Sequence, residues 1–174
     1  MNQILPLRRR SFIASLTAGA FTLGWQIPRQ AEAAVGAGSA VGIWAVIHPD
    51  DTVVVRIARS EMGQGSFTGL SQLVADELDC DWKHVRAEYV APDVNFAHDH
   101  AWGDMSTGGS RGIRGSVDYV REGGAVARAM LIAAAAKQWG VAPGACTAAD
   151  SVITHTPTGR RLRYGEVASA ASSP

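Results

Sequence analysis

The fold is set by a glycine-bearing turn, Glu61-Met62-Gly63-Gln64-Gly65, and by the segments on either side of it. A β-rich run from Val53 to Ala58 leads into the turn, and the segment from Ser66 to Leu78 leads out of it. That segment carries apolar residues at helical spacing, namely Phe67, Leu70, Leu73, Val74 and Leu78. The pattern predicts a strand, a tight turn and a helix whose first turn Ser66 caps through its hydroxyl.

Such a turn aims backbone N–H groups at one point in space. The first N–H groups of a helix have no partner within the helix, and the helix dipole adds partial positive charge there. Gly63 and Gly65 have no Cβ, so a ligand can approach the backbone closely, or the chain can take a positive φ. Gln64 offers both a donor and an acceptor. These features predict a site for a polar, anionic cofactor; a tight turn that binds nothing is the alternative that the spacing leaves open.

A second glycine block lies downstream and reads Thr107-Gly108-Gly109-Ser110. Its two hydroxyls and the N–H groups between them could hold a phosphate. Arg111 and Arg114 would favour an anion nearby, although both are equally suited to solvent. A flexible turn without a ligand is the alternative for this block.

The rest of the chain predicts an α+β fold, in which a β-hairpin and further short strands pack with two main helices. The longest helix is expected over Ser116–Trp139, with Ser116 as its cap and Gly140 as its stop. Gly123 and Gly124 lie inside that helix, where each costs about 1 kcal/mol relative to alanine, so another backbone or a cofactor is expected to approach closely there. The other expected elements begin with a hairpin of strands 41–48 and 52–59 over the turn Pro49-Asp50-Asp51. A strand at 85–90, a long loop at 91–116, a second hairpin of strands 151–156 and 160–164, and a helix at 165–171 are expected to follow.

Neither the cysteines nor the histidines predict a metal centre. Cys80 and Cys146 form no CxxC pair, so this chain is not expected to hold an iron–sulfur cluster or a structural zinc; a disulfide and two buried thiols are both open. His98 and His100 lie two positions apart without a third ligand at suitable spacing, and we interpret them as solvated side chains.

Composition excludes nucleic acid as an expected partner. The chain has 174 residues, with 16 basic and 16 acidic side chains. The first 33 residues hold four arginines and one glutamate, so the remainder carries 12 basic and 15 acidic side chains. A nucleic-acid-binding domain normally shows a basic face instead.

Residues 1–33 resemble a twin-arginine signal peptide. Arg8-Arg9-Arg10-Ser11-Phe12-Ile13 precedes an apolar stretch that is short and only moderately apolar, and Ala31-Glu32-Ala33 supplies a small-x-small cleavage pattern. We expect cleavage after Ala33 and a periplasmic protein, with an uncleaved, membrane-associated anchor as the alternative. Residues 34–41 then form a flexible lead-in, and residues 42–171 the domain proper.

The two glycine blocks resemble the molybdopterin-binding segments of the xanthine oxidase/aldehyde oxidase family. More narrowly, they look like the start of the β subunit of isoquinoline 1-oxidoreductase-type enzymes. The resemblance is carried by residues 61–65, by the block 106–111 and by Ala125-Val126-Ala127-Arg128, and it covers roughly 44–171. Two blocks in the expected order are more specific than a single glycine motif.

The resemblance implies a molybdopterin cofactor, either as such or as the cytosine dinucleotide. Gly63, Gln64 and Gly65 match the family's cofactor-contacting motif, and Thr107, Gly108, Gly109 and Ser110 match the segment that lines the pterin phosphate. Members of the family hydroxylate aldehydes or N-heterocycles with oxygen from water, and their electrons leave through iron–sulfur clusters on another subunit or domain. Gly112 departs from the family by replacing a hydroxyl residue.

The chain is also much shorter than the family's large subunits, and no segment matches the motif of the catalytic glutamate; Glu61 is not assigned that role. The expected protein is therefore the N-terminal portion of a molybdopterin-binding domain, inactive alone. Its expected partners are the remaining large-subunit domains, or a second chain that supplies them, a small iron–sulfur subunit and a small-molecule substrate. Two alternatives are an exported non-catalytic module that binds another anion, and a non-functional remnant.

Overall fold

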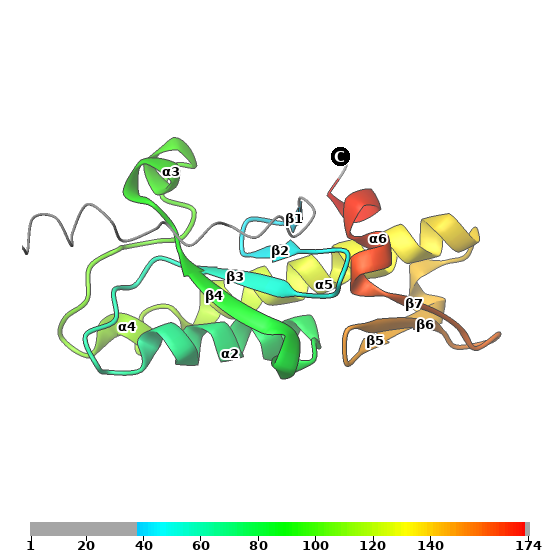
Figure 1. Ribbon diagram of the computed structural model, residues 1–174, viewed down its shortest axis with the longest axis horizontal. Coiled ribbons are helices and arrows are strands. Elements are labelled where there is room, and N and C mark those ends of the chain that lie inside the picture. The colour runs from blue at the N-terminus through cyan, green and yellow to red at the C-terminus, as the bar shows by residue number, and fades with distance from the viewer. Residues whose placement is uncertain (1–37, 173–174) are drawn as a thin grey trace, which may run out of the picture. The chain divides into compact units, whose positions relative to one another are not determined.

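The larger of two sheets has four strands, in the part of the chain that the computed structural model describes, residues 38–172 (Figure 1). The strand order is β1 (Ser39–Val41), β2 (Ala45–Ile47), β3 (Val53–Ile57) and β4 (Val85–Tyr89). The first three strands are antiparallel neighbours, whereas β4 runs parallel to β3. The predicted signal peptide at 1–33 lies outside the described residues.

The predicted hairpin over Pro49-Asp50-Asp51 is confirmed by the pairing of β2 with β3. The strand expected over 41–48 is wrong in its extent, because Gly42 takes a φ of 67° and starts a turn that folds the chain back on itself. Residues 39–41, which were expected to end a flexible lead-in, form β1 on the far side of that turn.

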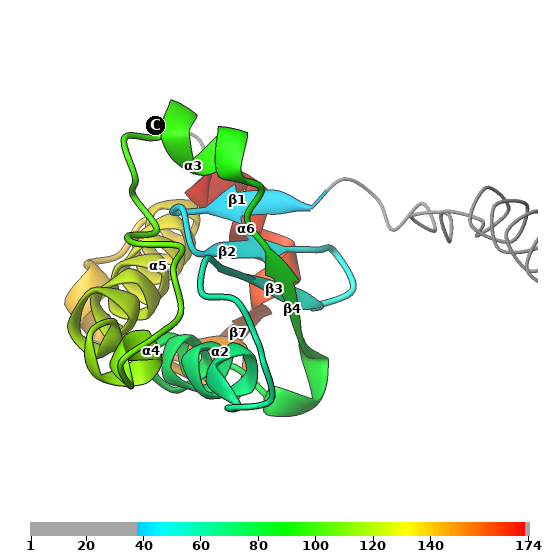
Figure 2. The ribbon, with the colours of Figure 1, turned by 90° about the vertical axis from the view of Figure 1, so that its left-hand side faces the viewer.

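Helix α2 (Ser66–Leu78) connects β3 to the parallel strand β4, and the long helix α5 (Val117–Trp139) packs along α2 (Figure 2). One face of β3 buries Val53, Val55 and Ile57 completely. Helix α2 packs against β3 and buries Leu70, Val74 and Leu78. The period of 2 in the strand and of 3.6 in the helix thus bury two apolar faces in one core.

The close approach of another backbone, predicted at Gly123 and Gly124, is confirmed at Gly124, whereas Gly123 is approached by a side chain. A Cβ added to Gly124 would lie 2.6 Å from the carbonyl oxygen of Val74 on α2, and one added to Gly123 would lie 2.1 Å from the Trp44 ring. The missing side chain of Gly124 lets α2 and α5 come together at this point. Gly140 ends α5 in the left-handed conformation, as predicted.

A second sheet of three antiparallel strands follows α5. It contains β5 (Cys146–Ala149), β6 (Val152–His155) and β7 (Arg160–Arg163), and a 3₁₀ turn, η2 (Pro143–Ala145), leads into it. The predicted hairpin is β6–β7, while β5 was not expected. The chain continues as α6 (Tyr164–Ala171), whose buried Tyr164 hydroxyl donates to the carbonyl oxygen of Leu78 at 2.6 Å.

The region 91–116, expected to be a loop, contains two short helices, α3 (Pro92–Ala97) and α4 (Arg111–Arg114). Proline at the first position of α3 presets a helical φ, and the extended residue before it is typical of a helix start. Buried Asn95 then holds the following turn, because its side chain donates to the Gly103 carbonyl and accepts from the Trp102 N–H. A 3₁₀ turn, η1 (Trp82–His84), also precedes β4.

Both cysteines are free thiols, so the disulfide alternative does not hold in this structure. Within residues 38–172 there is no group of three or more His, Cys, Asp or Glu side chains that could hold a metal ion. No helix in the described range is long and apolar enough to cross a membrane. Taken together, mixed helices and strands confirm the predicted α+β class.

Candidate functional site

We call the turn at residues 61–65 the first bend and the block at residues 107–110 the second bend. The N–H groups of the first bend converge on one point, and the Glu61 carboxylate occupies that point. Glu61 Oε1 accepts from the N–H groups of Gly63 at 2.7 Å and Gly65 at 2.9 Å, and Oε2 accepts from Phe67 at 3.0 Å. These bonds, with the one from Phe67 largest, hold the pKa of Glu61 below its ordinary value. The donor set therefore suits an anionic oxygen, as predicted, but the N–H groups are not free.

The predicted Ser66 cap is wrong. Gly65 occupies the cap position of α2 with a φ of 77° and makes no side-chain cap bond, so Glu61 satisfies the helix N-terminus instead. Buried Ser66 accepts a hydrogen bond from Gln64 Nε2 at 2.5 Å. Ser116 is likewise no side-chain cap for α5.

Gln64 holds the first bend together from inside. Its Oε1 accepts from the Met62 N–H at 2.6 Å, and its Nε2 also donates to the Ser60 carbonyl at 2.8 Å. All the hydrogen-bonding atoms of this side chain are therefore engaged within residues 60–66.

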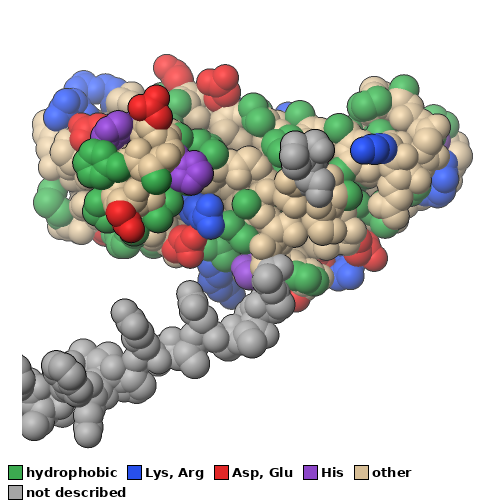
Figure 3. Space-filling model, turned by 90° about the horizontal axis from the view of Figure 1, so that it is seen from above, with side chains coloured by type: hydrophobic (Ala, Val, Ile, Leu, Met, Phe, Trp, Pro, Cys, Tyr) green, Lys and Arg blue, Asp and Glu red, His purple; other side chains and the backbone are tan. Residues whose placement is uncertain are grey.

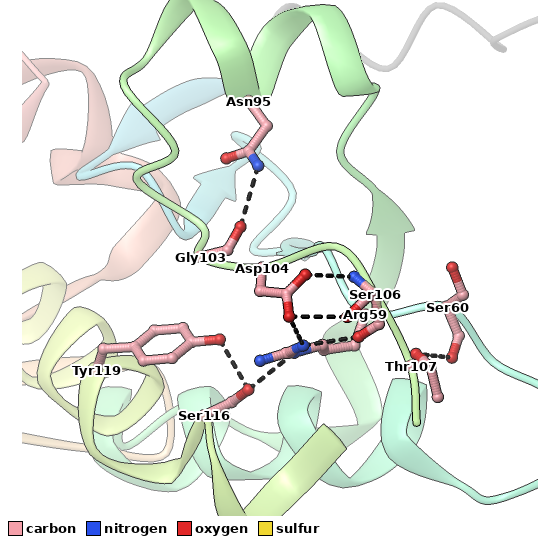
Figure 4. A network of polar contacts seen from close by, with 9 residues as sticks. All are labelled: Arg59, Ser60, Asn95, Gly103, Asp104, Ser106, Thr107, Ser116 and Tyr119. Atoms are coloured by element: carbon pink, nitrogen blue, oxygen red, sulfur yellow. Dashed lines mark hydrogen bonds and ion pairs between the residues drawn. The ribbon is translucent and has the colours of Figure 1, made fainter. Parts of the chain in front are cut away.

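The second bend meets the first at the Ser60 carbonyl. Thr107 Oγ1 donates to that oxygen at 2.8 Å (Figure 4). Behind the bend, α4 lies against the start of α2, where a Cβ added to buried Gly112 would contact Ser66 Cβ at 3.4 Å. Gln64 and Thr107 therefore share one acceptor, and the two predicted blocks lie side by side.

Buried Arg59 lies next to the contact between the two bends and binds residues on both sides of the second bend. Its Nη1 donates to the Ser106 carbonyl at 2.6 Å and pairs with Asp104 Oδ2 at 3.2 Å, and its Nε donates to Ser116 Oγ at 3.1 Å (Figure 4). The Ser106 N–H and hydroxyl, together with Arg59, lower the pKa of Asp104 to about 2. Ser116 Oγ accepts a second bond from the Tyr119 hydroxyl at 2.7 Å.

The outer faces of both bends are open. A Cβ added at Gly63, Gly65 or Gly108 would meet nothing within 4 Å. A hollow of about 450 Å³ lies beside Ser60, with Phe96, Asp104 and Met105 among its lining residues. Figure 3 shows histidine and hydrophobic side chains at the end of the molecule that carries α3, where the rings of Phe96 and His100 lie edge to face. The glycine faces of both bends are therefore accessible, and the hollow lies next to them at Ser60. An anionic ligand would have to displace the Glu61 carboxylate to reach the N–H groups of the first bend.

Sequence patterns predict both bends but not the residues that join them. Arg59 and Ser60 follow buried Ala58, just after the end of β3 at Ile57, and a charged residue at that place was the signal available in the sequence. Asp104 and Ser106 have the spacing of a side chain that bonds the backbone two residues on, which is also readable in sequence. The partners of Arg59 come from two distant segments, which no local pattern reveals.

Residues 14–174 match the family described as "Molybdopterin cofactor-binding domain", and the chain belongs to this family. The predicted membership of a molybdopterin-binding family is thereby confirmed.

Two curated proteins show the same relationship. The isoquinoline 1-oxidoreductase subunit beta of Brevundimonas diminuta is 35% identical over 133 residues, which is 76% of this chain and 17% of that protein. The membrane-bound aldehyde dehydrogenase [pyrroloquinoline-quinone] of Gluconacetobacter polyoxogenes is 36% identical over 125 residues, which is 72% of this chain and 15% of that protein. The chain spans about a sixth of the length of these relatives.

Solved structures confirm the fold. Quinoline 2-oxidoreductase from Pseudomonas putida 86 superimposes with a TM-score of 0.54 and 20% identity, over 75% of this chain and 16% of that one. The Cu,Mo-CO dehydrogenase gives a TM-score of 0.54 and 21% identity, over 92% of this chain and 23% of that one.

Proposed function

We propose that this chain is the cofactor-binding portion of a molybdenum hydroxylase large subunit, which oxidises an aldehyde or an N-heterocycle with water as the oxygen source. The observation that carries the proposal is the meeting of the two glycine bends at the Ser60 carbonyl, with open glycine faces on both. The names of the two curated relatives support an aldehyde or a heterocycle as the substrate class.

In this proposal the two bends hold the molybdopterin, and Gly63, Gln64, Gly65, Thr107, Gly108, Gly109 and Ser110 are its contacts. The bound cofactor would supply the redox centre. The chain's own residues would bind and orient it: the glycines admit it to the backbone, and Gln64 and Thr107 fix the position of one bend against the other. The cytosine dinucleotide form of the cofactor belongs to the same proposal.

The chain is proposed to be inactive alone, because it spans about a sixth of its curated relatives. The remaining large-subunit domains, or a second chain that supplies them, would complete the site, and a small iron–sulfur subunit would take the electrons. Export to the periplasm by the twin-arginine-type signal is part of the proposal, since that route carries proteins with a cofactor already loaded.

Cofactor analysis of the chain purified from its native host tests the proposal. Molybdenum by elemental analysis and a pterin by fluorescence after oxidation are expected in equal amounts. Pyrroloquinoline quinone, which stands in the name of one relative, is to be measured in the same sample by mass spectrometry. A preparation with that quinone or another anion, and without molybdenum, would refute the proposal and favour the non-catalytic module; the absence of a cooperative thermal transition would favour the non-functional remnant.

Replacing Gln64 tests the site itself. Gln64→Ala is expected to lower the molybdenum content while the fold stays intact, because the bend loses its three internal bonds but the core below it is untouched. Gln72→Ala, on the exposed side of α2 and away from the bends, is the matched control. Unchanged molybdenum content in Gln64→Ala would count against the assigned contacts.

A further inference from the structure

We propose that Arg59 is a positioning residue that closes the base of the loop 107–115 and so fixes the second bend against the first. The proposal rests on the proposed function, because the loop carries four of the assigned cofactor contacts. Its geometric part stands on the residues around the guanidinium.

The guanidinium bridges the two ends of this loop. Ser106 directly precedes the loop and Ser116 directly follows it, and Arg59 donates to the first at 2.6 Å and to the second at 3.1 Å. A single side chain therefore ties the entry and the exit of the segment that contains the second bend, and we call this arrangement the clamp.

The same side chain is anchored to the first bend through the backbone. Arg59 is the residue before Ser60, whose carbonyl accepts from Gln64 at 2.8 Å and from Thr107 at 2.8 Å. Displacing Arg59 would move this carbonyl and weaken both bonds. Arg59 thus controls the relative position of the two bends as well as the closure of the loop.

The burial of Arg59 and the charge beside it favour arginine at this position. Arg59 is only 5% exposed, and Asp104 compensates its charge at 3.2 Å. Asp104 is in turn held by the Ser106 N–H at 2.8 Å and the Ser106 hydroxyl at 2.7 Å. A planar fork with several donors can reach two oxygens and a carboxylate at once, whereas the single ammonium of a lysine cannot.

The loop contains its own reporter, because Arg111 and Arg114 are exposed sites for trypsin within 107–115. Arg160 and Arg161, exposed in β7, provide an internal reference. If Arg59 closes the loop, Arg59→Met should raise the rate of cleavage after Arg111 and Arg114 about tenfold or more, because cleavage follows the population of the opened segment. Cleavage after Arg160 and Arg161 should stay at the wild-type rate.

One further variant separates the geometry of the guanidinium from its charge, and a second serves as a control. Arg59→Lys should be cleaved almost as fast as Arg59→Met, and a wild-type rate in Arg59→Lys would overturn the proposal. Arg56→Met is the matched control, since Arg56 lies on β3, three residues before Arg59, and its ion pair is with exposed Glu88. The cleavage of this variant should match the wild type.

If Arg59→Met does not fold, Ser116→Ala opens one end of the clamp alone. Tyr119→Phe is its control, because it removes the other bond to Ser116 and leaves Arg59 in place. Faster loop cleavage in Ser116→Ala and wild-type cleavage in Tyr119→Phe are expected, and equal rates in the two would contradict the clamp.

Molybdenum content per chain links the clamp to the proposed function. Arg59→Met should retain less molybdenum than Arg56→Met. If the wild type contains no molybdenum, the proposed function fails, and the proteolysis still decides whether Arg59 closes the loop. If cleavage at Arg111 and Arg114 does not change in Arg59→Met, the clamp fails and the proposed function is untouched.

Discussion

Gln64 and Thr107 donate hydrogen bonds to the same oxygen, the carbonyl of Ser60, each at 2.8 Å. One residue belongs to the bend before α2 and the other to the bend before α4. A carbonyl oxygen has two lone pairs, so these two donors use its full accepting capacity. The two glycine blocks are joined by this single main-chain atom.

Removing the Thr107 hydroxyl should loosen that junction. Thr107→Val keeps the shape of the side chain but loses the bond, and we expect the free energy of unfolding to fall by about 1 kcal/mol. Urea denaturation measures the change. Thr107→Ser keeps a hydroxyl and should stay closer to the wild type; an equal loss in the two variants would show that the bond contributes nothing.

Adding a methyl group at Gly124 should separate the two long helices. A Cβ there would lie 2.6 Å from the carbonyl oxygen of Val74, a backbone atom that cannot rotate away. Overpacking of this kind typically costs about 1 to 3 kcal/mol, which thermal and urea unfolding of Gly124→Ala would measure. Gly144→Ala is the control, because a Cβ at that position meets nothing within 4 Å. Similar stabilities for the two variants would contradict the packing at Val74.

Neutralising Glu61 should destabilise the first bend. In Glu61→Gln an NH₂ group replaces one of the two oxygens that accept from Gly63, Gly65 and Phe67, so donors would face donors. The expected results are a lower melting temperature and faster amide exchange at these three residues. Glu88→Gln, which alters an exposed ion pair with Arg56, is the control. Unchanged exchange at the three amides in Glu61→Gln would rule out the carboxylate as their partner.

Acid should weaken the Asp104 contacts within a defined range of pH. The pKa of Asp104 is lowered from 3.8 to about 2, so its stabilising effect is complete above about pH 4 and is lost as the pH falls through 2. The difference in stability between the wild type and Asp104→Asn should therefore be constant above pH 4 and shrink between pH 4 and pH 2. Chemical denaturation across this range measures it. A difference that persists unchanged below pH 2 would show that the charge of Asp104 is not responsible.

Cys80 should resist alkylation in the folded protein. Burial raises the pKa of its thiol from 9.0 to about 12, which leaves about a thousandth of the ordinary thiolate at pH 8. Iodoacetamide should modify Cys80 slowly in buffer and quickly in denaturant, as followed by mass spectrometry. Equal rates in both conditions would place the thiol in solvent.

Local signals predicted the helices and the hairpins well. The bounds of α2 at Ser66 and Leu78 followed from a 3.6-residue period that begins directly after a glycine turn, and Gly140 marked the end of α5. The errors have physical causes. Gly42 divides the first expected strand because its positive φ starts a turn, and α3 begins at Pro92 inside a segment that has little periodicity.

The candidate site was predicted in its parts but not in its connections. Both glycine blocks could be read in sequence, because they are short and flank helical segments. The sequence does not reveal that the Glu61 carboxylate accepts from the N–H groups of its own turn, because this depends on how the side chain folds back in space. That Arg59 would reach Ser106 and Ser116 depends on the tertiary fold, which brings the end of a strand beneath a distant loop.

The carbonyl oxygen of Ser60, which accepts from both bends, belongs to the main chain, and every residue type has such an oxygen. Saturation mutagenesis should therefore find two adjacent codons with opposite tolerance. Position 60 should accept most side chains, because its own hydroxyl makes none of these bonds, whereas position 59 should accept arginine alone. A comparison of many homologous sequences could then overlook the more central of the two residues, since an atom common to all amino acids leaves no trace of selection.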